Sequence, residues 1–189
     1  MGKRKLALSS TRDITFYAYL NSAAQWALEQ AEGTEEGRFY NCMSSIMLSA
    51  FCIEAYLNYI GSEIIPYWDE DVKQNINTPN KLKILCHHLN LAPDFSRRPF
   101  QSFKHITKYR NIIAHGTSVK ISDQSTQTVR DGEKVKYPKT WWEEQSNLIF
   151  AKRWLADTES IIIAIHEAAG KGSIPFGILE IATQFSTVK

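Results

Sequence analysis

The sequence predicts an all-α protein, an up-and-down bundle of about five helices with a polar hairpin or loop inserted near residues 117–139. Three observations predict it. Apolar residues recur at helical spacing over most of the chain, glycines and prolines separate these stretches, and the 117–139 segment is polar. We expect a single domain over residues 1–189, with a core over about 12–169 and an apolar tail at 173–185.

Two long helices are predicted in the first third of the chain. Residues 11–32 have apolar residues at helical spacing, and Gly33 ends that pattern. Thr34 can cap the next helix, which we expect to run to about Gly61.

The second of these helices is unusually apolar. Its segment 39–62 carries one charged residue, Glu54, and is long enough to cross a bilayer. A carboxylate near the middle would be costly in lipid, so we interpret the segment as a buried core helix and expect no membrane association.

Shorter elements follow. Residues 67–76 predict a short helix or an irregular segment, because Pro66 interrupts the chain before them. Thr78 and Pro79 then suit the start of a helix that ends near residue 89. A further helix is expected over 99–115.

The last third of the chain begins with a turn. Gly116 is expected to end the 99–115 helix in a left-handed conformation. Asp131 and Gly132 predict a hairpin turn, or a mobile loop, in the polar insertion. Helical spacing then resumes over 142–169.

Composition excludes several classes of protein. The net charge of +2 means that any nucleic-acid contact must come from a local basic patch. Three cysteines without a CxxC pair argue against a disulfide framework or a structural zinc site. No signal peptide is recognisable, so we expect a cytoplasmic protein with no metal and no cofactor.

The 99–115 helix carries an unusual charge. On a helical wheel, Phe103, Ile106 and Ile113 fall in one arc, and Arg110 lies in its middle. An arginine in an apolar arc is expensive unless it is paired. Glu54, the lone charge of the other apolar helix, is therefore its predicted partner.

A polar stripe lies beside that arc. It consists of Lys104, Thr107, Asn111 and His115, with Asn111 and His115 four residues apart and so neighbours. From residue 97 to 120 the sequence has six basic side chains and no acidic one, which would attract phosphate. The candidate RNA-binding residues among them are Arg97, Arg98, Lys104, Lys108 and Lys120.

The residue types suit RNA cleavage, because RNA carries its own nucleophile, the 2′-OH. His115 can take or give a proton near neutral pH, and Arg110 can stabilise the charge of a phosphorane-like transition state. Asn111 can hold the imidazole or a phosphate oxygen. The sequence leaves open whether His115 is the acid or the base.

The stretch RNIIAH at 110–115 resembles the Arg-x4–6-His motif of HEPN domains, with the asparagine that often follows the arginine there. The preceding helix LSAFCIEAYLNYI, with its embedded Glu54, is similar to the earlier core helix of that family. The resemblance implies an all-α bundle and metal-independent endoribonuclease activity in a homodimer. It also implies a toxin–antitoxin or phage-defence setting, with an antitoxin or operon partner protein.

One subgroup of HEPN proteins is regulated at a tyrosine two residues after the histidine, and Thr117 stands at that position here. The sequence therefore departs from that subgroup, while the ribonuclease motif is intact. The alternative hypothesis is a non-catalytic interaction module or a nucleotide- or RNA-binding module, in which Arg110 and Glu54 form a structural pair.

Overall fold

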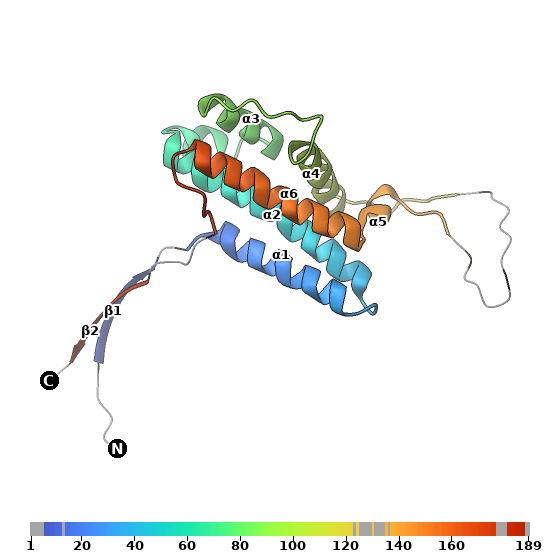
Figure 1. The fold of residues 1–189 in the computed structure, drawn as a ribbon, viewed down its shortest axis with the longest axis horizontal. Helices are drawn as coiled ribbons and strands as arrows, with labels where there is room; N and C mark the ends of the chain where they lie inside the picture. Colours follow the sequence, from blue (N-terminus) through green and yellow to red (C-terminus); the bar gives the residue numbers. More distant parts are fainter. Residues whose placement is uncertain are drawn as a thin grey trace, which may run out of the picture.

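The computed structural model describes residues 6–12, 14–122, 124, 130, 135, 137–176 and 181–187, and these form a helical bundle (Figure 1), so the all-α prediction is confirmed. The elements in chain order are β1 (Leu6–Arg12), α1 (Phe16–Gly33), α2 (Arg38–Ile64), the π-helical turn η1 (Trp68–Val72), α3 (Thr78–His88), α4 (Phe100–Ala114), α5 (Trp141–Gln145), α6 (Leu148–Ala168) and β2 (Ile181–Thr187).

Helix α2 is the centre of the bundle. Helices α1 and α6 lie along it, and α3 and α4 pack on it as well (Figure 1). The buried face of α1 is built largely from alanines, namely Ala24, Ala27 and Ala31. Small side chains at helical spacing let two helix backbones approach closely, which suits the tight α1–α2 hairpin.

The hydrophobic core falls into two clusters along α2. One surrounds the C-terminal half of α2 and includes Tyr56, Trp68 and Phe103. The other surrounds its N-terminal half and includes Tyr109 and Trp154. Helix α4 contributes to both, so its position is fixed at two points and the side chains it exposes have defined directions.

A close contact in the first cluster depends on a glycine. The indole of Trp68, which is fully buried, lies directly against Gly61 of α2, and a Cβ at that position would overlap the Trp68 ring. Two atoms cannot share that space, so any side chain at residue 61 must displace the indole from its place in the core.

We therefore expect Gly61→Ala to lower the free energy of unfolding by about 1–3 kcal/mol, the range for overpacked cores. Urea denaturation followed by circular dichroism measures this change. The matched control is Gly33→Ala, because a Cβ at the end of α1 meets nothing within 4 Å. Equal stability of the two variants would contradict the proposed packing.

Several element boundaries differ from the sequence expectation. Helix α2 begins after Gly37, which has a left-handed φ of 71°, and not after Thr34. Helix α3 is capped by Asn77, whose side chain accepts a hydrogen bond from the Asn80 N–H at 3.0 Å, one residue before the predicted cap. The helix predicted over 142–169 is in fact two, α5 and α6.

Gly116 has another role than the predicted one. Its φ is not left-handed, so the prediction of a left-handed stop was wrong. A Cβ there would lie 2.7 Å from the backbone oxygen of Ile112, so this position needs glycine because the helix end passes too close to it.

The insertion and the tail are described only in part. Residues 117–122 and 137–139 form neither helix nor strand, and the predicted Asp131–Gly132 turn lies outside the described residues. Pro175 and Phe176, at the start of the apolar tail, dock on Tyr17 of α1 through a 2.8 Å hydrogen bond and a ring contact. Farther on, β2 pairs antiparallel with β1, a ribbon that the sequence did not predict.

Within the described residues, α2 is the one helix long and apolar enough to cross a membrane by length and composition. Half of its most apolar window is buried inside the bundle. This burial is what we expect of a core helix. Core helices of soluble proteins also meet this criterion of length and apolar composition.

Candidate functional site

Helix α4 and its C-terminal end carry the three candidate catalytic residues. The predicted ion pair is present: Nη2 of Arg110 contacts Oε2 of Glu54 on α2. The side chains of Arg110 and Glu54 are 20% and 27% exposed, so the pair lies at the edge of the α2–α4 contact, neither fully buried nor free in solvent. Glu54 therefore fixes one edge of the guanidinium.

A third charge lies near this pair. Lys81 of α3 is buried and donates a 2.7 Å hydrogen bond from Nζ to the backbone oxygen of Lys73. Burial lowers the pKa of Lys81, the Glu54 carboxylate opposes that shift, and the Arg110 charge adds to it. Lys81 is thus electrostatically coupled to the pair, although its ammonium bonds a backbone oxygen and forms no ion pair with Glu54 among the described residues.

Asn111 is exposed and lies next to the guanidinium. Its Oδ1 accepts a 2.9 Å hydrogen bond from Nη1 of Arg110. Arg110 is therefore oriented from two sides, by a carboxylate and by an amide. This bond uses the Asn111 oxygen, and the two roles predicted for Asn111, holding the imidazole or a phosphate oxygen, stay predictions.

His115 is exposed at the C-cap of α4, where its backbone N–H donates to the backbone oxygen of Asn111 at 3.0 Å. Its side chain lines a hollow of about 500 Å³. The other walls come from the end of α4, the segment after it and the start of α5: Ile112, Ile113, Gly116, Thr117, Val119, Thr140, Trp141 and Trp142.

The structure brings Arg110, Asn111 and Glu54 together but does not bring His115 to them. Arg110 is directed toward α2 and does not line the His115 hollow. This agrees with the helical wheel, on which residues five apart lie about 140° around the axis.

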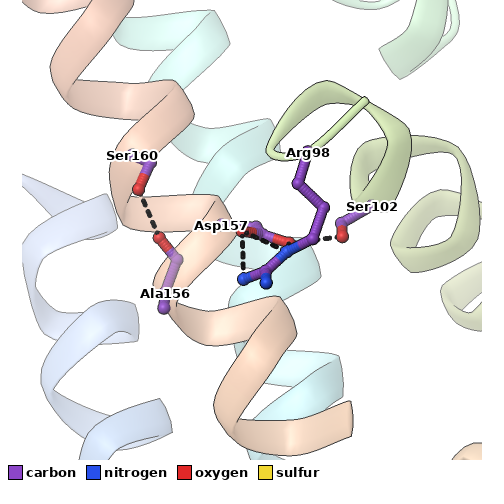
Figure 2. Close-up of polar contacts among 5 residues, drawn as sticks. All are labelled: Arg98, Ser102, Ala156, Asp157 and Ser160. Carbon is purple, nitrogen blue, oxygen red and sulfur yellow. Dashed lines mark hydrogen bonds and ion pairs between the residues drawn. The ribbon is translucent and has the colours of Figure 1, made fainter. Parts of the chain in front are cut away.

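Arg98 has a defined structural role. Its Nη2 and Nε donate to the carboxylate of Asp157 on α6, at 2.8 and 2.9 Å. The Ser102 hydroxyl donates to the same carboxylate (Figure 2). The bond to Asp157 also raises the pKa of Arg98. This cluster ties the start of α4 to α6, so a predicted RNA-binding arginine is engaged in holding the fold.

Asp157→Ala is expected to lower the free energy of unfolding by about 1–3 kcal/mol, because the buried Ser102 hydroxyl loses its acceptor and the guanidinium loses its partner. Urea denaturation measures it. The matched control is Glu35→Ala, which removes the exposed 3.5 Å pair with Arg38. Exposed pairs contribute about 0–1 kcal/mol, so the two variants should differ clearly.

The remaining predicted RNA-binding residues are exposed. Lys108 holds its Nζ 4.3 Å from the centre of the Trp141 ring, and Lys104 lies 5.5 Å from the centre of the Phe95 ring. Both lysines are thus positioned by aromatic rings and still reach solvent. Lys120 is exposed in the segment beside the His115 hollow.

Sequence reasoning missed the aromatic wall of the site. Trp141 and Trp142 line the His115 hollow because α5 starts there with a capping box between Thr140 and Glu143. The signal was present as a Thr-x-x-Glu spacing around the two tryptophans. Glu143 is occupied by this cap, since its bonds to Thr140 lower the pKa of the carboxyl.

Among the described residues, no group of three or more histidine, cysteine or acidic side chains is arranged to hold a metal ion. The chain matches no protein-family model, and no curated protein or solved structure is similar to it. The resemblance to HEPN domains therefore depends on the sequence alone, on the RNIIAH motif and the apolar helix with Glu54.

Proposed function

We propose that the protein is a HEPN-like, metal-independent endoribonuclease. The observation that supports this most is the arrangement at one helix end. Arg110 is oriented by Glu54 and Asn111, and His115 lies exposed in a hollow of about 500 Å³ at the end of the same helix. A fixed positive charge and a proton-transferring group are what cleavage by 2′-OH attack needs.

In the proposed reaction the 2′-oxygen of the ribose attacks the adjacent phosphorus, and the bond from phosphorus to the 5′-oxygen of the next nucleotide breaks. One group removes the proton from the 2′-OH, and another gives a proton to the departing 5′-oxygen. The products are a 2′,3′-cyclic phosphate and a 5′-OH. Arg110 stabilises the negative charge that builds up on the phosphorane oxygens.

The site is proposed to be completed by a second copy of the chain. In one protomer His115 and Arg110 are not in contact, and we propose that a twofold axis beside α4 brings the His115 of one protomer to the Arg110 of its partner. Two histidines would then supply both an acid and a base. Closed twofold dimers are also the commonest homo-oligomers.

A direct test is incubation of the purified protein with single-stranded RNA in EDTA. We expect cleavage products that end in 2′,3′-cyclic phosphate, identified by mass spectrometry. Cleavage that requires Mg²⁺ and leaves 3′-OH ends would show that the proposal is wrong.

The oligomeric state is a separate prediction. We expect a homodimer at tens of micromolar in sedimentation velocity, with the two α4 helices lining one cleft. A monomer at that concentration would rule out the shared site. Mixing Arg110→Ala with His115→Ala protein tests the sharing itself, because a mixed dimer keeps one complete pair of these groups and should recover part of the activity.

The second candidate is a non-catalytic RNA- or nucleotide-binding module. The engagement of Arg110 by both Glu54 and Asn111 favours it, since such an arginine can be structural. In that case the protein would bind RNA and leave it intact.

From the resemblance we further propose a cytoplasmic toxin–antitoxin or phage-defence role with a partner protein. To test for toxicity, the growth of cells that express the wild-type protein is compared with the growth of cells that express His115→Ala protein.

A further inference from the structure

A second cavity lies on α4, away from His115. It has a volume of about 410 Å³ and lies where α3, the following connector and α4 meet. Phe95 is the partly exposed aromatic ring of its wall, whereas Phe103, at 1% exposure, belongs to the core beneath it; Thr107 of α4 also lines the cavity. Cavities of this size with aromatic walls are typical of small-molecule sites.

The charged part of this cavity is basic. Lys83 of α3 and Lys104 and Lys108 of α4 line it, and no acidic side chain among the described residues does. Within the described part of the chain, none of these three lysines forms an ion pair. The Lys104 ammonium lies over the Phe95 ring and the Lys108 ammonium over Trp141, so positive charge without an ion-pair partner lies in and beside the cavity, which suits a planar aromatic ligand that carries phosphate.

The cavity and His115 share one face of α4. Lys104, Lys108 and His115 lie within about 40° of one another at 100° per residue. Lys108 also connects the two places physically, because it lines the cavity while its Nζ lies 4.3 Å from the centre of the Trp141 ring, a wall of the His115 hollow.

The spacing along this face suits a nucleic-acid strand. Seven to eleven residues separate Lys108 and Lys104 from His115, which is about 10–16 Å at 1.5 Å per residue. At about 3.4 Å per stacked nucleotide this is about three to five nucleotides.

We propose that this cavity, lined by Lys83, Phe95, Phe103, Lys104, Thr107 and Lys108, binds one nucleotide of the single-stranded RNA substrate at a distance from the cleaved bond. The base stacks against the aromatic wall, and the lysines hold the flanking phosphates. The inference rests on the proposed ribonuclease activity and assigns to it a substrate subsite that the motif alone does not contain.

Substrate length gives the first test. The KM of a dinucleotide, which reaches only the His115 site, is compared with that of a hexanucleotide, which reaches both. Lys83→Ala removes one charge from the cavity, and Thr107→Phe fills it without changing the charge. We expect each to raise the ratio of hexanucleotide KM to dinucleotide KM about tenfold, a loss typical of one stacked base. An unchanged ratio in both variants would overturn the subsite.

Binding without turnover gives the second test. Calorimetry with a nucleoside monophosphate, with the nucleoside and with inorganic phosphate distinguishes stacking from simple anion attraction. We expect the monophosphate to bind most tightly and Thr107→Phe to abolish the difference. Phosphate that binds as tightly as the nucleotide, or a nucleotide that binds Thr107→Phe and wild type equally, would overturn the proposal.

The two hypotheses fail in different ways. Suppose that the wild type cleaves neither substrate, while the wild type binds the mononucleotide and Thr107→Phe does not. The ribonuclease hypothesis is then wrong, and the cavity remains a nucleotide site. If the wild type cleaves both and neither variant changes the KM ratio, the ribonuclease stands and the subsite is wrong. Lys152→Ala is the matched control, because this lysine of α6 pairs with Glu32 outside the cavity and should leave the KM ratio unchanged.

Discussion

His115→Ala is expected to slow RNA cleavage by about 10²- to 10⁴-fold while the fold is retained, since that is the usual contribution of a general acid or base. The side chain is exposed at the C-cap of α4, and the helix end is held by its backbone N–H, which alanine keeps. Single-turnover cleavage with enzyme in excess measures the rate, and urea denaturation checks the stability.

The matched control for this prediction is His88→Ala. His88 is likewise an exposed histidine in the last turn of a helix, but it belongs to α3 and does not line the His115 hollow. The His88→Ala variant should cleave RNA at the wild-type rate. Wild-type cleavage by His115→Ala would remove this histidine from the mechanism and favour the binding-module hypothesis.

The sequence predicted those features that depend on local spacing and on conspicuous single charges. Helical periodicity placed α2 and α4 nearly correctly, because their apolar faces are long. The contact between Glu54 and Arg110 could be inferred because each is an isolated charge on an apolar helix face. Such a charge in a bundle needs a partner, and few candidates existed.

Features that depend on contacts between distant segments could not be predicted in this way. Asp157, the partner of Arg98, lies 59 residues later, in a helix that offers several charged residues. The ribbon of β1 and β2 joins the two ends of the described chain, and a pairing register over that separation has no local signal. The break between α5 and α6 lies at Ser146, whose hydroxyl is hydrogen-bonded to Tyr109 at 2.6 Å.

The basic residues on and around α4 show the same limit of prediction from sequence. A count of Lys and Arg along the sequence treats all five predicted RNA-binding residues alike, but the structure separates them. Arg98 is bound to Asp157 although its side chain is half exposed, whereas Lys104 and Lys108 lie against aromatic rings and form no ion pair among the described residues. Lys83, on α3, joins these two lysines only in three dimensions.

Arg110→Ala is expected to slow cleavage by about 10²- to 10³-fold, the usual effect of losing one preorganised donor to a transition-state oxyanion. It should also destabilise the protein, since it leaves the Glu54 carboxylate unpaired. Complete burial of such a pair would make that cost about 3–5 kcal/mol, and because both side chains are partly exposed we expect a smaller loss of about 1–3 kcal/mol. Cleavage and urea denaturation are measured on the same preparation.

Glu54→Gln separates the two effects. It keeps the shape of the side chain and an oxygen that can accept from Arg110, but it removes the charge that orients the guanidinium. If Arg110 acts on the phosphate, Glu54→Gln should retain much more activity than Arg110→Ala at similar stability, because the guanidinium remains in the site. If Arg110 is only structural, cleavage in both variants should follow the fraction of folded protein.

Arg110→Lys completes the argument, because it keeps a positive charge beside Glu54 but loses the planar fork that can donate to two oxygens at once. For a structural pair, lysine should restore most of the stability and with it most of the activity. For a group that binds the phosphorane, stability should return while cleavage stays well below that of the wild type. Wild-type cleavage by folded Arg110→Lys protein would therefore exclude a role that depends on the guanidinium fork, and would leave Arg110 with the structural role that its contact with Glu54 already shows.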